Sequence, residues 1–214
     1  MTLWAIISDV HSRGDRLARV LGDADSAGAE RILSLGDVGS TSAIDLLDRA
    51  GATHVFGNWE ASGLRGLPQP HRACVSAWPA YVKGPEFWAA HASPVWPDGL
   101  LIQSVVEYLR QNDLGWQDLF PSLQRSADAR WAAFAELEDA HISAFFHGHT
   151  HTQETWQWRL GASPRYIKTD QFVLEPDDSR WLIGVGSAGD PHDGNGACYA
   201  LFDDKLLQVS LRRV

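Results

Sequence analysis

Short apolar runs alternate with amphipathic stretches through the first sixty residues of the chain. Residues 3–7 form an apolar run with two β-branched residues that ends at Ser8-Asp9, which is typical of a buried strand. A helix is predicted next, because apolar residues recur at helical spacing between Gly14 and Ala24. The pattern then repeats, with predicted strands at 31–35 and 53–56 and, between them, a helix that begins at Thr41-Ser42 and ends at Gly51.

Strands that alternate with helices predict a sheet with parallel pairing and with helices on its faces. Ligand sites in such sheets lie at the carboxyl ends of the strands. Polar side chains follow all three predicted strands at that end: Asp9 and His11, then Asp37, then Asn58. This recurrence is the first indication of a functional site.

The middle of the chain is less regular. Pro68, Pro70 and Pro79 favour a loop, and residues 87–90 predict a strand that leads into His91. Apolar residues at 102, 105, 106 and 109 share one face of a predicted helix, residues 112–128 form a weakly patterned connection, and a second predicted helix carries Trp131, Phe134 and Leu137.

Strand-like segments separated by turn residues fill the C-terminal third. They are predicted at 142–146, 152–158, 171–174, 181–185, 197–202 and 206–211. Because no repeat, low-complexity stretch or linker interrupts the pattern, residues 1–214 are expected to form a single domain with two stacked sheets.

Charge and composition narrow the classes of partner. The chain carries 27 acidic and 18 basic residues, a net charge of -9 that repels polyanions, so extended nucleic acid is not an expected partner. No apolar run approaches the roughly 18 residues of a membrane helix, and the first residues lack the basic region of a secretory signal. Two cysteines, Cys74 and Cys198, are too few to cross-link a chain of this length. We therefore expect a cytoplasmic protein without a membrane partner.

One short motif, Gly148-His149-Thr150-His151, is not expected by chance in this chain. Gly-His-x-His is expected about 0.03 times in a chain of this composition, whereas the Asp-x-His of Asp9 and His11 is expected about 0.8 times. The motif also follows a predicted strand directly. Two histidines separated by one residue can direct their imidazole nitrogens into one small volume, which suits a transition metal.

The polar residues at the predicted strand ends are too many for one metal ion. They comprise two carboxylates, one amide and four imidazoles: Asp9, His11, Asp37, Asn58, His91, His149 and His151. A carboxylate shared by two cations about 3.5–4 Å apart is the usual device of a two-metal hydrolytic site. The set therefore predicts two metal ions.

The same motifs, Asp-x-His, Gly-Asp, Gly-Asn, a lone His and Gly-His-x-His, occur here in the order found in the calcineurin-like metallophosphoesterases. The chain resembles that family from Asp9 to His151. The resemblance implies an α/β fold, a four-layer α/β/β/α sandwich of two mixed β-sheets flanked by helices.

The resemblance also implies a role for each residue. Asp9, His11 and His151 would hold one metal, Asn58, His91 and His149 the other, and Asp37 would bridge them. Nitrogen and oxygen ligands without thiolate favour Mn, Fe, Zn or Co. Hydroxide formed between the metals would attack phosphorus in line, which makes Asp37, Asn58 and His91 catalytic as well.

The chain departs from the family at one position. In the fuller family motif a histidine follows the Asn and protonates the leaving oxygen, but here the segment reads Gly57-Asn58-Trp59-Glu60. In this respect the chain resembles some small prokaryotic members of phosphodiesterase type, which also lack this histidine. Indole is not a useful acid at neutral pH, and the loss of a general acid costs about 10²–10⁴ in rate unless the leaving group is a stable anion. The expected substrate is therefore a small phosphodiester or a nucleotide phosphoanhydride, such as a dinucleoside polyphosphate, rather than a phosphoprotein.

Three residues are candidates for contact with the substrate. Arg13 follows a predicted ligand, Trp59 stands beside another, and His192 lies in a glycine-rich loop, residues 186–194, that resembles a loop near the site in similar small proteins. Each has an ordinary alternative: an exposed helix-start residue for Arg13, rim packing for Trp59 and an exposed loop residue for His192.

The chief alternative function is a non-catalytic interaction scaffold, as in the retromer subunit that resembles this family. The seven candidate metal ligands, which occur in the order of the family's motifs, argue against a scaffold. A nuclease is disfavoured by the acidic charge and by the lack of a basic stripe. An oligomer is compatible with the sequence, which identifies no interface.

Overall fold

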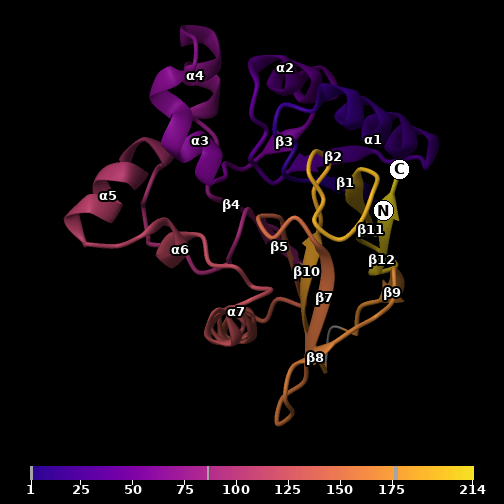
Figure 1. The fold of residues 1–214 in the computed structure, drawn as a ribbon. Coiled ribbons are helices and arrows are strands. Elements are labelled where there is room, and N and C mark those ends of the chain that lie inside the picture. The colour runs from indigo at the N-terminus through magenta and orange to yellow at the C-terminus, as the bar shows by residue number, and fades with distance from the viewer. Residues whose placement is uncertain (1, 86, 176–177) are drawn as a thin grey trace.

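Two six-stranded sheets lie face to face in the computed structural model, which describes residues 2–85, 87–175 and 178–214 (Figure 1). The first sheet has the order β3 (Thr53–His54), β2 (Arg31–Ser34), β1 (Leu3–Ile7), β11 (Cys198–Asp203), β12 (Gln208–Arg213) and β9 (Gln171–Val173). The second has the order β4 (Tyr81–Lys83), β5 (Phe87–Ala90), β6 (Ala144–His147), β10 (Arg180–Val185), β7 (Gln153–Trp158) and β8 (Arg165–Tyr166). Both sheets are mixed: β1, β2 and β3 pair in parallel, as do β5, β6 and β10, and the other pairs are antiparallel.

Alternate residues of the two sheets fill the space between them. Phe87, Phe146 and Phe202 meet there, with the Phe87 ring 5.3 Å from that of Phe202 and 5.7 Å from that of Phe146 in edge-to-face contacts. Such pairs add to the free energy of apolar burial. This interior fixes how the strand ends of one sheet stand against those of the other.

Helices cover the outer faces and complete the four-layer α/β/β/α arrangement. α1 (Gly14–Ser26) and α2 (Thr41–Arg49) pack on the first sheet, and α7 (Ala127–Asp139) packs on the second. The remaining helices extend from one end of the sandwich (Figure 1): α3 (Asn58–Gly63), η1 (Leu64–Gly66), α4 (Gln69–Val75), η2 (Ile102–Ser104), α5 (Val105–Gln111) and α6 (Trp116–Leu119). None of the helices described is long and apolar enough to cross a membrane.

Several local predictions were wrong. Part of the proline segment is helical: Pro70 lies in the first turn of α4 (Gln69–Val75), where the missing N–H costs no hydrogen bond, whereas Pro79 lies outside helices and strands as predicted. The third strand is shorter than predicted and ends at His54. Val106 and Trp131, predicted on buried helix faces, are 50% and 44% exposed.

The weakly patterned connection at 112–128 contains the single turn of α6, and the short strands β4 and β8 were not predicted at all. Elements of two to four residues are too short for a periodic pattern to identify them.

Candidate metal centre

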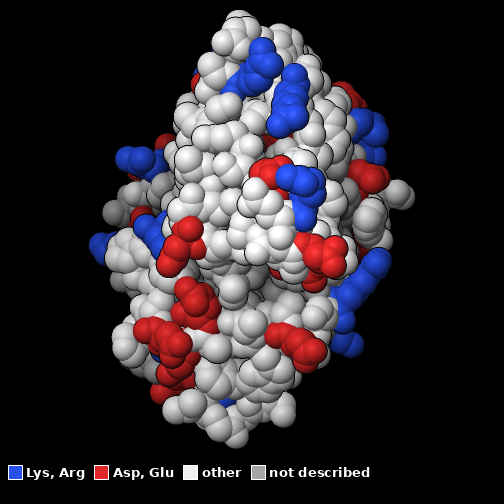
Figure 2. Space-filling view, turned by 90° about the vertical axis from the view of Figure 1, so that its left-hand side faces the viewer, with Lys and Arg blue, Asp and Glu red and all other residues white. Residues whose placement is uncertain are grey.

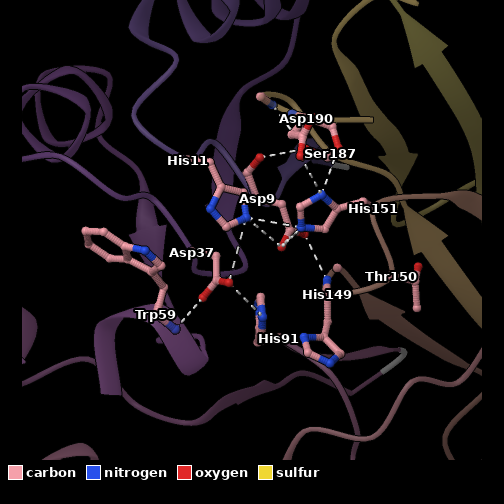
Figure 3. A network of polar contacts seen from close by, with 12 residues as sticks. Asp9, His11, Asp37, Trp59, His91, His149, Thr150, His151, Ser187 and Asp190 are labelled. Atoms are coloured by element: carbon pink, nitrogen blue, oxygen red, sulfur yellow. Dashed lines mark hydrogen bonds and ion pairs between the residues drawn. The ribbon is translucent and has the colours of Figure 1, made fainter. Parts of the chain in front are cut away.

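The carboxyl ends of the parallel strands of both sheets meet at one edge of the sandwich. The loops after β1, β2 and β3 bring Asp9, His11, Asp37 and Asn58, and the loops after β5 and β6 bring His91, His149 and His151. Backbone hydrogen bonds join these loops, from the Asp9 N–H to the Gly36 carbonyl oxygen (3.1 Å) and from the Gly148 N–H to the His91 carbonyl oxygen (2.9 Å). Residues far apart in the sequence thus surround one small volume (Figure 3).

Asp9, His11 and His151 form one group of potential metal ligands. The Nε2 atoms of the two histidines are 3.1 Å apart, and Oδ1 of Asp9 lies 3.4 Å from Nε2 of His151 and 3.8 Å from Nε2 of His11. Oδ1 of Asp9 is buried and accepts no hydrogen bond. The Nδ1–H of His151 donates to the Asp190 carbonyl oxygen (2.7 Å), so Nε2 faces this group and offers it a lone pair when the ring is neutral.

A second group comprises Asp9, Asp37 and His91, with Asn58 beside it. Nδ1–H of His91 donates to the Leu35 carbonyl oxygen (2.8 Å), so in the neutral ring the Nε2 lone pair faces Oδ1 of Asn58 at 3.0 Å and Oδ2 of Asp37 at 3.5 Å. Oδ2 of Asp37 is also 3.8 Å from Nε2 of His11 in the first group. Asp37 therefore lies between the two groups, which is the position expected of a bridging carboxylate.

These groups fit cations. When the imidazoles are neutral, lone pairs in both groups face one another or a carboxylate oxygen, and the orphaned Oδ1 of Asp9 lies in the same volume. A buried acceptor without a donor costs free energy unless a proton or a cation satisfies it. Imidazole and carboxylate donors without thiolate suit the transition metals expected from the sequence.

Backbone N–H groups hold one oxygen of each aspartate. The His149 N–H donates to Oδ2 of Asp9 (2.9 Å), and the Trp59 N–H donates to Oδ1 of Asp37 (2.8 Å). Only the other oxygen of each carboxylate faces the cluster. Its direction is therefore fixed before any ligand binds.

His149 takes a different place from the other predicted ligands. Its ring packs edge-to-face on that of His91 (5.1 Å between centroids) and lies 6.3 Å from the ring of Phe120. Among the side chains that the structure describes, it joins neither group of close ligand atoms. Its assignment as a metal ligand stays a prediction.

Glu60 anchors the loops that carry Asp37 and Asn58, a role the sequence analysis did not assign. Its buried carboxylate accepts hydrogen bonds from the N–H groups of Asp37 (2.8 Å), Val38 (2.7 Å) and Gly57 (2.9 Å). Burial raises the pKa of Glu60, the nearby Asp37 carboxylate adds to that, and the three N–H donors oppose it. The carboxylate thereby joins the loops after β2 and β3.

The glycines of two motifs are required by close packing. A Cβ on Gly57 would overlap Oδ1 of Asp37, and one on Gly148 would overlap Oδ2 of Asp9. Gly-Asn and Gly-His-x-His thus place backbone directly against the two carboxylates. Any side chain at either position would displace an anchored aspartate.

Backbone strain is concentrated in the site. Nine non-glycine residues of the described ranges have positive φ, and five of them are predicted ligands: Asp9, His11, Asp37, His149 and His151. L-residues rarely adopt this conformation, and it persists where surrounding contacts enforce it. The hydrogen-bonded loops supply those contacts here.

Burial and the neighbouring charges shift the titration of the site. Burial disfavours the charged form of Asp9, yet the adjacent His11 and His151 side chains lower its pKa well below the usual range, while burial raises the pKa of Asp37. Burial lowers the pKa of His149 to about 3, assisted by the charge of His91. Burial also opposes protonation of His151, but the contact with Asp9 outweighs it and raises that pKa to about 9. A cation that binds His151 must therefore displace a proton at neutral pH.

The three residues predicted to contact the substrate lie at different places around the site. The Arg13 guanidinium is half-exposed and hydrogen-bonds Asp15 on α1 (3.5 Å). Trp59, 41% exposed, borders the cluster on the α3 side (Figure 3). His192 stacks on the His151 ring, with the ring centroids 4.5 Å apart.

The loop that carries His192 contributes two residues that the sequence analysis missed. Asp190 groups with His151 and His192 as a third set of potential ligands, and Oγ of Ser187 donates to the Asp9 carbonyl oxygen (2.7 Å). The glycine-rich composition of residues 186–194 was the signal that pointed to this segment.

Comparisons with known proteins relate the chain and its fold to others. The chain is 24% identical over 240 residues, 98% of this chain and 86% of the other, to the uncharacterized protein MJ0912 of Methanocaldococcus jannaschii. Its fold resembles that of a metallophosphoesterase from Sphaerobacter thermophilus (TM-score 0.74, 23% identity, 99% of this chain and 88% of the other). It also resembles that of a putative diadenosine tetraphosphatase (TM-score 0.52, 15% identity, 99% of this chain and 93% of the other).

The family model of the calcineurin-like phosphoesterase superfamily domain matches residues 1–205, nearly the whole sequence. The chain therefore belongs to the calcineurin-like phosphoesterase superfamily.

Proposed function

We propose that residues 1–214 act as one domain that hydrolyses a small phosphodiester or a nucleotide phosphoanhydride, with Asp9, His11, Asp37, Asn58, His91, His149 and His151 holding two metal ions. The observation that carries the proposal is the position of Asp37, whose Oδ2 is 3.8 Å from Nε2 of His11 and 3.5 Å from Nε2 of His91. One carboxylate shared by two ligand groups is the feature that a two-metal phosphoesterase requires.

The bound metals would supply Lewis-acid stabilisation of the phosphoryl oxygens and a water acidified to near neutral pKa. The residues of the chain hold and orient that centre. Asp9 and Asp37 present one oxygen each, because the N–H groups of His149 and Trp59 occupy the others. His91 and His151 present Nε2, because backbone carbonyl groups bind their Nδ1–H.

The substrate class follows from Trp59. Its indole stands where similar proteins carry an acid, so the leaving group must depart without a proton from this residue. Phosphoanhydrides and aryl phosphodiesters meet that condition, because their leaving groups are stable anions. The diadenosine tetraphosphatase assignment of one structural neighbour is consistent with this class.

The proposal is tested by metal analysis of the purified protein and by hydrolysis assays with Mn and with chelator. The substrates are bis(p-nitrophenyl) phosphate, p-nitrophenyl phosphate and diadenosine tetraphosphate. We expect metal-dependent turnover that favours the diester or the tetraphosphate. Asp37→Asn should abolish it, whereas Asp139→Asn, at an exposed position of α7, should not.

Two results would overturn the proposal. A preference for the phosphomonoester would show that the indole of Trp59 does not restrict the enzyme to phosphodiesters and phosphoanhydrides. Absence of bound metal and of turnover with every substrate would favour the alternative function, an interaction scaffold that keeps this fold without catalysis.

A further inference from the structure

A second concavity lies between the helices that extend from the end of the sandwich. It has a volume of about 580 Å³ and is bounded by α3, η1, α4, η2 and α5. This size is within the range of small-molecule sites. We call it the helical groove; its lining includes Ser62, Arg65, Arg72, Val106 and Arg110.

The helical groove is positively charged in an acidic protein. Arg65, Arg72 and Arg110 line it, and Glu107 is its one acidic lining residue among those described, which gives a local charge of about +2 against -9 for the whole chain. Arg110 pairs with Glu107 (2.6 Å), and Nη2 of Arg72 donates to the neutral amide oxygen of Gln69 (2.9 Å). Figure 2 shows the corresponding face, with Lys and Arg side chains toward the upper end and Asp and Glu side chains toward the lower.

The helical groove also offers an apolar surface. Leu64 and Ile102 are buried beneath it, and Val106 is 50% exposed on its wall. Guanidinium groups beside apolar side chains suit a ligand that combines phosphate with a flat, weakly polar ring. A nucleoside phosphate has this composition.

The helical groove adjoins the metal centre through α3. Asn58 begins this helix beside His91, and Ser62, which lines the groove, donates through Oγ to the Trp59 carbonyl oxygen (3.1 Å). Asn58 and Ser62 are about 6 Å apart along the helix axis. The groove therefore begins about one turn of α3 away from Asn58.

We propose that the helical groove binds the distal nucleoside phosphate of a nucleotide phosphoanhydride, with Arg65 and Arg72 on its phosphate and Val106 against its nucleoside. This inference rests on the proposed function and extends it by a substrate subsite. Hydrolysis occurs at the metal centre, and the groove selects substrates with a second nucleotide end.

Binding without turnover tests the subsite independently of catalysis. ADP is titrated calorimetrically into the chain with excess chelator, so that no metal draws its phosphates to the metal centre. We expect saturable binding that weakens about tenfold or more in the double variant Arg65→Ala/Arg72→Ala, because charge-assisted contacts to phosphate are lost. Arg19→Ala/Arg125→Ala, which removes the same charge at exposed positions elsewhere, is the control and should bind ADP as the unmodified chain does.

A second variant keeps the subsite testable if the double arginine variant does not fold. Val106→Glu places a carboxylate in the helical groove at a position that is already exposed and should also weaken ADP binding about tenfold. Leu160→Glu, at a residue that is 80% exposed outside the groove, should not. Absence of saturable ADP binding, or equal loss in variant and control, overturns the subsite and would favour an acidic peptide as the ligand of the groove.

Kinetics separate failure of the subsite from failure of the proposed function. With Mn, both groove variants should raise KM for diadenosine tetraphosphate about tenfold and leave kcat/KM for bis(p-nitrophenyl) phosphate unchanged. An unchanged KM for the tetraphosphate in an active enzyme refutes the subsite alone. Absence of turnover of both substrates by the unmodified chain refutes the proposed function.

Discussion

Replacing Glu60 by glutamine tests whether one buried carboxylate holds the two loops of the metal centre together. Glu60 accepts three backbone N–H groups, those of Asp37 and Gly57 on Oε2 and that of Val38 on Oε1. Glutamine has a single acceptor oxygen. With that oxygen toward Asp37 and Gly57, its NH₂ group faces the Val38 N–H, and two donors meet.

The expected cost follows from these contacts. One buried N–H left without an acceptor costs about 1–3 kcal/mol, and the two remaining hydrogen bonds each weaken by about 1 kcal/mol when the acceptor is neutral. Two effects offset part of this loss. Burying an amide costs less free energy than burying a carboxylate, and the neutral amide is not repelled by the Asp37 carboxylate. We expect Glu60→Gln to lower the free energy of unfolding by about 2–4 kcal/mol.

Urea denaturation of the metal-free chain measures this difference, and metal analysis of separate samples, loaded with Mn and then dialysed, reports on the site. Glu30→Gln, at an exposed position, is the control and should change stability by less than about 0.5 kcal/mol. A loss below about 1 kcal/mol in Glu60→Gln, with full metal content, would refute the role of Glu60 as an anchor.

Three further predictions follow from particular contacts. Trp59→His should raise turnover of substrates with poor leaving groups, by up to about 10²-fold, relative to aryl diesters; an unchanged ratio would mean that position 59 does not set the substrate class. Gly148→Ala should lower the bound metal measured after dialysis, because its Cβ would overlap Oδ2 of Asp9, and full metal content would contradict that reasoning. Burial lowers the pKa of His54, with the Asp48 carboxylate opposing, so the neutral ring is the stable form in the fold. Its contribution to stability is then present above its unfolded-state pKa of about 6.5 and is lost as pH falls toward the folded value. In urea denaturation from pH 7.5 to 5 the loss of stability should be smaller for His54→Gln than for the unmodified chain; an equal loss would assign the acid sensitivity to other groups.

The strands and helices of the first half were predictable because their patterns are local. The apolar run at 3–7 and the helical spacing after Gly14 each describe one face of one element, and β1 and α1 formed where the pattern placed them. The strand-end rule then predicted that Asp9, Asp37 and His91 would lie together, and they do.

Other features depend on neighbours that no local pattern reveals. The elements that pack against α5 decide whether the side chain of Val106 is buried or exposed. In the structure it is exposed on the wall of the helical groove. The three N–H groups held by Glu60 come from residues 3, 22 and 23 positions away, brought together by the pairing of β2 with β3. Asp190 reaches His151 only because the loop after β10 returns over the strand ends of both sheets.

By itself the sequence determined the alternating strands and helices of the first sixty residues and the chemistry of the donor set, since residue type and spacing act within a few positions. Only the tertiary structure decided which lone pairs face one another, which carboxylate oxygen is anchored, and which apolar side chain remains exposed. Those outcomes depend on contacts between segments that are distant in the chain, and the packing of the two sheets is what creates them.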